Sequence, residues 1–166
     1  MAILKIARMG HPVLLDRAEE VADPMAPDVQ RLIADMAETL ADAGGIGLAA
    51  PQVYQSLRLF LWRDGAELRV LINPEITPIG TETALGWEGC LSVPGLRGQV
   101  ARLARVAWRG LDHAGKTVQG EASGLAARVL QHENDHLDGV FYLMRMNDLT
   151  RLGFIEELAR LVESGA

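Results

Sequence analysis

The sequence predicts an α+β fold, in which helices near both ends bracket a strand-rich middle. Apolar residues recur at helical spacing before residue 44 and after residue 123, and at strand spacing between them. The predicted strands follow one another in a run, which favours antiparallel or mixed sheets. The chain has 166 residues, so we expect one domain over 1–166 with one sizeable core.

A first helix is predicted over residues 26–43. Pro27 suits its first turn, and Gly44-Gly45 end it. Its apolar residues recur every three or four positions, as on the buried face of a helix: Val29, Leu32, Ile33, Met36 and Leu40.

The middle of the chain carries strand patterns over residues 58–62 and 68–72, joined by a turn at Asp64-Gly65. Residues 100–108 alternate more loosely and predict a further strand. A hairpin turn at 112–115 leads into the next one.

Two more helices are predicted after the strands. Ser123 is the expected N-cap of the first, which runs to about Leu137 and ends at Asp138-Gly139. The last helix is predicted over residues 148–162.

The helix after Ser123 carries the run His-Glu-Asn-Asp-His at its C-terminal end. Positions i and i+4 share one helix face, so His132 and His136 can direct their imidazoles at a common metal ion. Glu133 lies one step round the helix, within reach of a water bound to that ion. This is the arrangement of metal-dependent hydrolases. We therefore expect the sheets to pack around a central metal-binding helix.

The alternative for this pattern is a pair of surface histidines among solvated acids. Leu125 and Val129 fall on the same stripe as His132 and His136, which favours an inward position for both imidazoles. Buried imidazoles need polar partners, and a metal ion supplies them.

Two histidines leave the site short of a third protein ligand. A zinc endopeptidase would take it from an acid about twenty residues downstream, where Glu156 and Glu157 lie. The other candidate is Cys90, the single cysteine, since a thiolate is a strong soft ligand. The helix pattern alone leaves both open.

The composition excludes several classes of function. The formal net charge is −6, which does not favour binding to DNA or to an anionic membrane. No apolar run approaches the roughly 18 residues that a membrane span needs, and the N-terminus does not resemble a signal peptide. One cysteine allows no internal disulfide, which fits a reducing compartment, so we expect a cytoplasmic protein.

Three motifs occur together: GIGLAAPQ at 45–52, EGCLS at 88–92 and QHENDHLDG at 131–139. In this order and spacing they resemble the peptide deformylase family. The resemblance extends from GHPVL at 10–14 to GVFYLMRM at 139–146, which is most of the chain.

The resemblance implies a hydrolase that removes the N-terminal formyl group from formyl-methionine of nascent polypeptides. It implies that Cys90, His132 and His136 hold one divalent metal ion, whose bound water attacks the formyl carbon. The ion is expected to be Fe²⁺ in the cell, with Zn²⁺, Ni²⁺ or Co²⁺ possible in preparations. Glu133 is implied as the general acid/base.

The resemblance also implies that the Gln52 amide and the Leu91 backbone N–H stabilise the oxyanion, and we group Gly47 with these catalytic residues. The peptide is expected to pair with an edge strand. The residues expected to bind the substrate are Gly45, Ile46, Gly89, Leu125 and Val129. A member that binds metal or peptide without turnover is a third hypothesis, disfavoured because Glu133, Cys90 and Gln52 are all intact.

Three further expectations concern charged residues. Arg128 either narrows the methionine pocket or, as we slightly favour, turns to solvent at the helix rim. Glu88 is expected to pair with Arg102 or Arg97 beneath the metal loop. The C-terminal run FIEELARLVESGA is net acidic, so ribosome association is only weakly supported.

Overall fold

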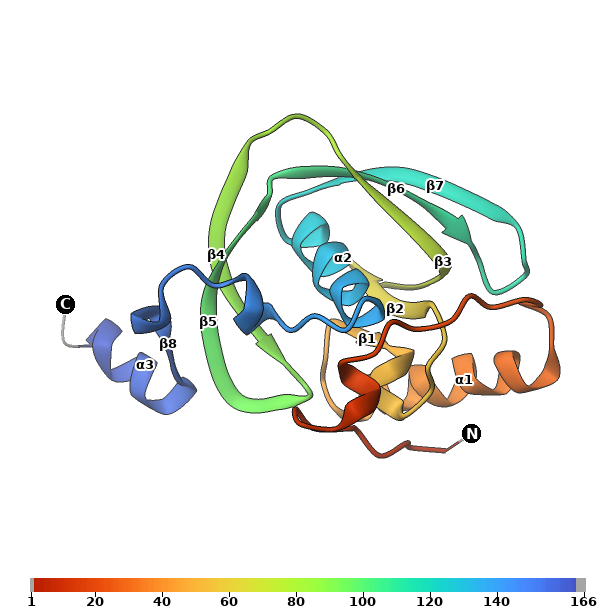
Figure 1. Ribbon diagram of the computed structural model, residues 1–166, viewed down its shortest axis with the longest axis horizontal. Helices are drawn as coiled ribbons and strands as arrows, with labels where there is room; N and C mark the ends of the chain where they lie inside the picture. Colours follow the sequence, from red (N-terminus) through yellow and green to blue (C-terminus); the bar gives the residue numbers. More distant parts are fainter. Residues whose placement is uncertain (1, 164–166) are drawn as a thin grey trace.

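The computed structural model describes residues 2–163 and places two antiparallel sheets around a central helix (Figure 1). The α-helices are α1 (Pro27–Asp42), α2 (Gly124–Leu137) and α3 (Ile155–Glu163). The strands are β1 (Gly47–Ala49), β2 (Leu59–Asp64), β3 (Glu67–Pro78), β4 (Thr83–Cys90), β5 (Val93–Leu103), β6 (Arg105–Leu111), β7 (Thr117–Ser123) and β8 (Leu152–Phe154). Short 3-10 turns are η1 (Pro12–Leu14), η2 (Ala50–Val53), η3 (Tyr142–Arg145) and η4 (Leu149–Arg151).

The strands form a five-stranded sheet in the order β1-β2-β3-β6-β7 and a three-stranded sheet in the order β4-β5-β8. Strand β1 lies at the edge of the first sheet and β4 at the edge of the second. Within residues 2–163, each of these two edge strands has one side without a neighbouring strand. The predicted α+β class with a central helix is therefore confirmed.

Helix α1 packs its apolar stripe on the first sheet. Val29, Ile33, Met36 and Leu40 are buried and share a hydrophobic cluster with residues of β2. The helix ends where Gly44 takes a φ of +62°, a left-handed conformation that favours glycine. The chain then enters β1 directly.

Helix α2 is central because it buries both of its faces. Ala127, Leu130 and Leu137 pack with Trp62 and Trp108 of the first sheet. The other side of the helix carries the histidines of the HENDH run and faces the second sheet. Ser123 occupies the N-cap position with extended backbone, as predicted, although its side chain makes no capping hydrogen bond.

The structure corrects two predicted elements and adds one. The predicted strand over 100–108 is two strands in different sheets, because the chain crosses between the sheets at Ala104, whose N–H donates to Glu82 O at 2.8 Å. The last helix begins at Ile155 and not at 148, because residues 152–154 pair with β5. Strand β4, which carries the EGC run, was not predicted.

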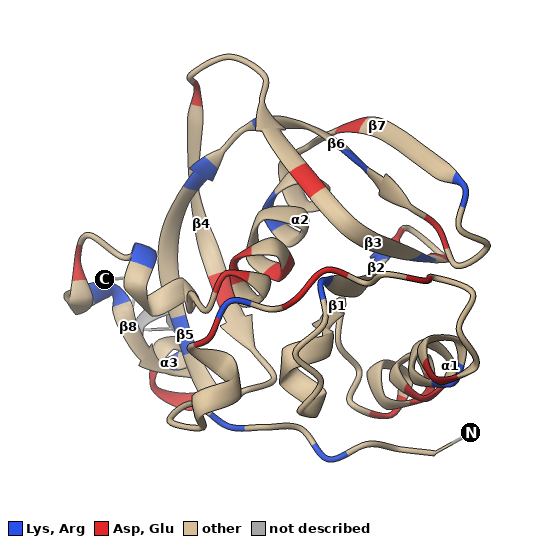
Figure 2. Cartoon of the chain, turned by 45° about the vertical axis from the view of Figure 1, so that its right-hand side comes forward, with Lys and Arg blue, Asp and Glu red and all other residues tan. Residues whose placement is uncertain are grey.

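The surface mixes charges of both signs. Figure 2 shows Lys and Arg spread over both sheets and interspersed with Asp and Glu. Within the described residues, no helix combines the length and apolar character needed to cross a bilayer.

Candidate active site

The candidate metal ligands converge from two elements. Helix α2 sets the His132 and His136 rings 5.0 Å apart, and β4 delivers Cys90 at its last position. The ligand atoms of the three side chains all lie within 4.8 Å of one another, with Cys90 Sγ 3.2 Å from His136 Nε2. Among the described residues, this is the one group of three or more such side chains that could hold an ion. Glu156 and Glu157 lie exposed on α3 and do not join it.

The chemistry of this donor set fits a transition-metal ion. Both histidines are buried, with 8% and 1% of their surface exposed. The Nδ1 atom of His132 is hydrogen-bonded to Glu88, so the Nε2 atom is available as a metal ligand. Burial, with the neighbouring His132 and Arg102, holds the pKa of His136 well below its usual range, so that ring is neutral. Burial lowers the pKa of His132, but hydrogen bonds with Cys90 and Glu88 outweigh it and raise the pKa to about 10, so a metal ion would have to displace a proton from this ring.

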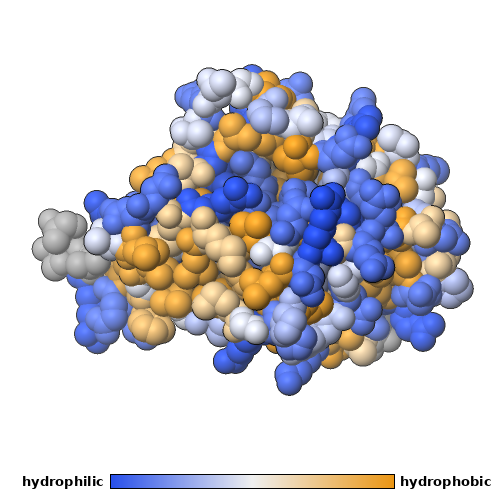
Figure 3. Space-filling view, viewed as in Figure 1, coloured by the Kyte–Doolittle hydropathy of each residue, from blue (hydrophilic) through white to orange (hydrophobic). Residues whose placement is uncertain are grey.

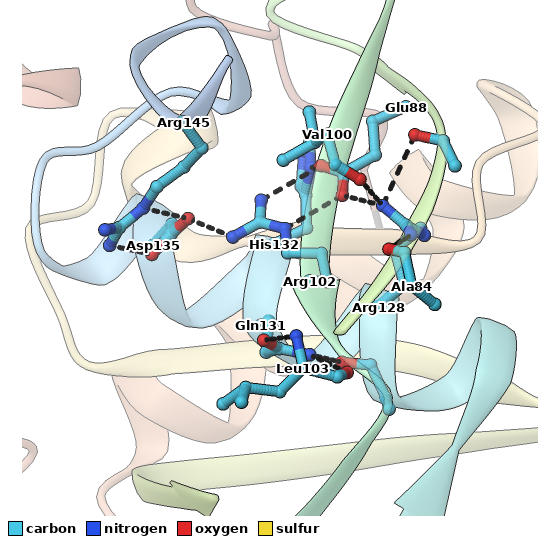
Figure 4. A network of polar contacts seen from close by, with 12 residues as sticks. Ala84, Glu88, Val100, Arg102, Leu103, Arg128, Gln131, His132, Asp135 and Arg145 are labelled. Atoms are coloured by element: carbon cyan, nitrogen blue, oxygen red, sulfur yellow. Dashed lines mark hydrogen bonds and ion pairs between the residues drawn. The ribbon is translucent and has the colours of Figure 1, made fainter. Parts of the chain in front are cut away.

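A buried polar network fixes the orientation of His132 (Figure 4). Glu88 Oε2 lies 2.8 Å from His132 Nδ1, and Arg102 donates to both Glu88 oxygens at 2.8 and 2.9 Å. Arg102 also donates to Asp135, which in turn accepts from Arg145. Burial alone would raise the pKa of Glu88, but the bonds from Arg102 and His132 outweigh it and lower the pKa to about 2. Arg102 and Arg97 were the two expected partners of Glu88, and Glu88 pairs with Arg102.

Glu133 is buried beside β1. Burial raises the pKa of its carboxyl to about 7, and Oε2 has no hydrogen-bond partner within the described structure. A side chain at Gly47 would collide with this carboxylate, since a Cβ there would overlap Glu133 Oε1 and fall 2.6 Å from Cδ. Gly47 is therefore required for the approach of β1 to Glu133, and a carboxyl with this pKa suits proton transfer near neutral pH.

Gln52 is oriented by its own hydrogen bonds. Its Oε1 accepts from the Ala49 N–H at 2.9 Å, and its amide nitrogen donates to Ser92 Oγ at 3.1 Å and toward Cys90 Sγ at 3.5 Å. The NH₂ end of the amide therefore faces the candidate metal ligands. Leu91 follows Cys90 in the tight turn between β4 and β5, so its backbone lies at the same place.

A cavity of about 530 Å³ opens onto these groups. Eleven of the twelve predicted site residues line it: Gly45, Ile46, Gly47, Gln52, Gly89, Cys90, Leu91, Leu125, Val129, His132 and Glu133. His136, the twelfth, lies beneath this lining. Leu125 is 63% exposed, whereas Val129 is 9% exposed and also belongs to the core cluster.

The structure adds neighbours that sequence reasoning missed. Ser92 lies within the EGCLS motif and positions Gln52, so its place in the motif was an available signal. Tyr142 stacks on His132 with ring centroids 6.0 Å apart, and Ile155 of α3 lines the cavity. No sequence pattern indicated either residue. The favoured solvent-facing position of Arg128 is wrong, because its side chain is 11% exposed and bonded to Glu88.

The central helix, the convergent thiol and imidazoles, and the buried carboxyl beside them define the protein as a metal-dependent hydrolase.

Comparisons with known proteins identify the family. The polypeptide deformylase family matches residues 3–152. A peptide deformylase of Nitrosomonas europaea is 40% identical over 166 residues, covering 94% of each chain. One of Bordetella pertussis is 44% identical over 163 residues, covering 92% of this chain and 93% of the relative. The chain belongs to the polypeptide deformylase family.

Solved structures agree. Peptide deformylase from Thermotoga maritima has a TM-score of 0.86 and 38% identity, covering 89% of this chain and all of that one. The actinonin-bound enzyme from Acinetobacter baumannii has a TM-score of 0.83 and 36% identity, with the same coverage. Peptide deformylases remove the N-terminal formyl group from nascent polypeptides by metal-dependent hydrolysis.

Proposed function

We propose that this chain is a peptide deformylase that acts on formyl-methionyl peptides, with Cys90, His132 and His136 holding one divalent ion. The observation that carries this proposal is the convergence of these three side chains at the cavity that Cys90, His132 and Glu133 line. When bound, the ion lowers the pKa of a coordinated water and polarises the formyl carbonyl. The zinc endopeptidase alternative loses support, because Glu156 and Glu157 lie outside the metal group.

Glu133 is proposed as the general acid/base. As the carboxylate it accepts a proton from the attacking water. As the acid it returns that proton to the amine nitrogen when the formyl C–N bond breaks, which releases formate and a free N-terminus. A carboxyl whose pKa is about 7 exchanges protons readily in both directions at neutral pH.

The Gln52 amide NH₂ and the Leu91 backbone N–H are proposed to stabilise negative charge on the formyl oxygen. The bond from the Ala49 N–H to Gln52 Oε1 supports this role, because it aligns the amide before substrate arrives. Each such donor is worth about 3 kcal/mol of barrier in comparable sites.

The peptide backbone is proposed to lie between the edge strands β1 and β4. Gly45, Ile46 and Gly47 line one side of the cavity, and Gly89 lines the other. Both strands have a side without a strand partner, which supports recognition by strand addition. The methionine side chain would then enter between Ile46, Leu125 and Val129.

The identity of the metal ion, the cellular location and the extent of the domain are also proposals. We propose Fe²⁺ as the ion in the cell, a cytoplasmic location and a single catalytic domain over 1–166.

Ribosome docking through the C-terminus has little support. Exposed side chains there include the apolar Leu149, Phe154 and Ile155, and Figure 3 shows hydrophobic surface on the side of β5 and β8. RNA is bound chiefly by basic surfaces.

The test is formate release from formyl-Met-Ala-Ser by anaerobically purified, iron-loaded protein. We expect turnover that a chelator abolishes and added Fe²⁺ or Ni²⁺ restores. Cys90→Ser should lose most bound metal, whereas Glu157→Gln should keep it. Absence of metal-dependent formate release from a fully loaded sample would refute the proposal.

A further inference from the structure

Arg128 lies on α2 one turn before His132 and forms part of the cavity wall. Its guanidinium donates to the carbonyl oxygens of Ala84 at 2.7 Å and Val100 at 2.8 Å, and to Glu88 Oε1 at 2.8 Å. Figure 4 shows the side chain among these residues of β4 and β5. Contacts to two strands and a buried carboxylate hold the cation in one place.

Gly86 on β4 makes room for this guanidinium. A Cβ built at Gly86 would lie 2.8 Å from Arg128 Nη2, 2.9 Å from Cζ and 3.0 Å from Nε. Such similar distances to three bonded atoms mean that the Cβ would sit over the face of the guanidinium and not beside its edge. Any larger residue at 86 would displace the cation from the wall.

The guanidinium retains hydrogen-bonding capacity. Arginine carries five N–H groups. The hydrogen bonds that the described residues make with Arg128 all use Nη1 or Nη2, and none uses Nε. Leu125 and Val129 line the same cavity with apolar surface. The cavity thus combines apolar walls with a cationic donor, Arg128, that its hydrogen bonds hold in place.

We propose that Arg128, for which Gly86 leaves room, forms the end wall of the pocket for the first side chain of the substrate. This wall selects a side chain that carries lone pairs next to its terminal methyl group, the methionine thioether or its sulfoxide, over a hydrocarbon of the same length. The proposal rests on the proposed deformylase function. A site that provides a hydrogen-bond donor discriminates against an analogue that offers no acceptor.

The test compares kcat/KM for three substrates that differ only in the first side chain: formyl-Met-Ala-Ser, formyl-norleucine-Ala-Ser and formyl-Met-sulfoxide-Ala-Ser. A thioether is a weak acceptor and a sulfoxide oxygen a strong one. We expect kcat/KM to be about threefold higher for the methionine peptide than for the norleucine peptide, and about tenfold higher for the sulfoxide peptide than for the norleucine peptide. In Arg128→Met both ratios should fall to about one, and in Arg128→Lys they should fall part of the way.

Two variants serve as controls. Arg105→Met removes an exposed arginine of β6, paired with Glu121 away from the cavity, and should change neither the ratios nor the rate. Arg97→Met removes a second cation from the cavity lining and should leave the ratios unchanged if the wall, and not the overall charge, is responsible.

The wild-type measurement already decides part of the question. Equal kcat/KM for methionine and norleucine, together with poor turnover of the sulfoxide, would overturn the proposal even if Arg128→Met does not fold. Identical ratios in wild type, Arg128→Lys and Arg128→Met would overturn it as well. Absence of formate from all three peptides would instead refute the deformylase function itself.

Discussion

Gly47→Ala is the sharpest perturbation of the proposed acid/base, because the added methyl points at Glu133. The new Cβ would fall 2.6 Å from Glu133 Cδ, against about 3.5–4.0 Å for an ordinary carbon contact, so one group must move by roughly 1 Å. A misplacement of this size costs about 100-fold in rate, and overpacking of this kind costs about 1–3 kcal/mol of stability.

The assay is kcat for formyl-Met-Ala-Ser together with metal content and thermal unfolding. We expect kcat to fall about 100-fold while bound metal is unchanged, because no candidate ligand is touched. Gly153→Ala is the matched control: its Cβ would meet the end of the flexible Leu158 side chain at 3.0 Å, outside the cavity lining. A folded Gly47→Ala protein with kcat within about twofold of wild type would refute the assigned position of Glu133.

Further predictions concern charge and ligation. The pKa of Glu133 is raised to about 7, so a step that needs its carboxylate should gain rate as pH rises through about 7, and a kcat/KM profile that is flat from pH 5 to 9 would contradict this. Glu88→Ala leaves Arg102 without its main partner and should cost about 3 kcal/mol in denaturant unfolding, whereas Glu75→Gln, at an exposed pair, should leave the unfolding midpoint unchanged. The pKa of Glu88 is lowered to about 2, so its stabilising contribution is complete above about pH 4.5 and is lost as pH falls toward 2; acid unfolding of wild type and Glu88→Ala should converge there. Cys90→Ser should weaken metal binding at least tenfold, measured by competition with a chelator.

The sequence predicted which side chains lie together more accurately than it predicted the strands around them. His132 and His136 are one helical turn apart in any α-helix, so local geometry was sufficient to pair them. Cys90 needed the family resemblance, because its approach to the histidines depends on how two sheets pack. Nothing local in β4 specifies that approach.

The missed features share a physical cause. Strand β4 has exposed Leu85 and Trp87 on one side and small or charged residues on the other, so it lacks the alternation of a half-buried strand. The crossing at Ala104 interrupts a pattern that reads as one strand. Arg128 was placed in solvent because its acceptors, the carbonyls of Ala84 and Val100, are invisible in side-chain patterns.

The two edge strands beside the cavity have a consequence for the range of proteins this chain can process. Hydrogen bonds to a peptide main chain are the same whatever side chains follow the first residue. Under the proposed strand addition, the chain would therefore accept many unrelated newly made polypeptides. Selectivity for side chains would then rest on the pocket that residues of β1, β4 and α2 line together.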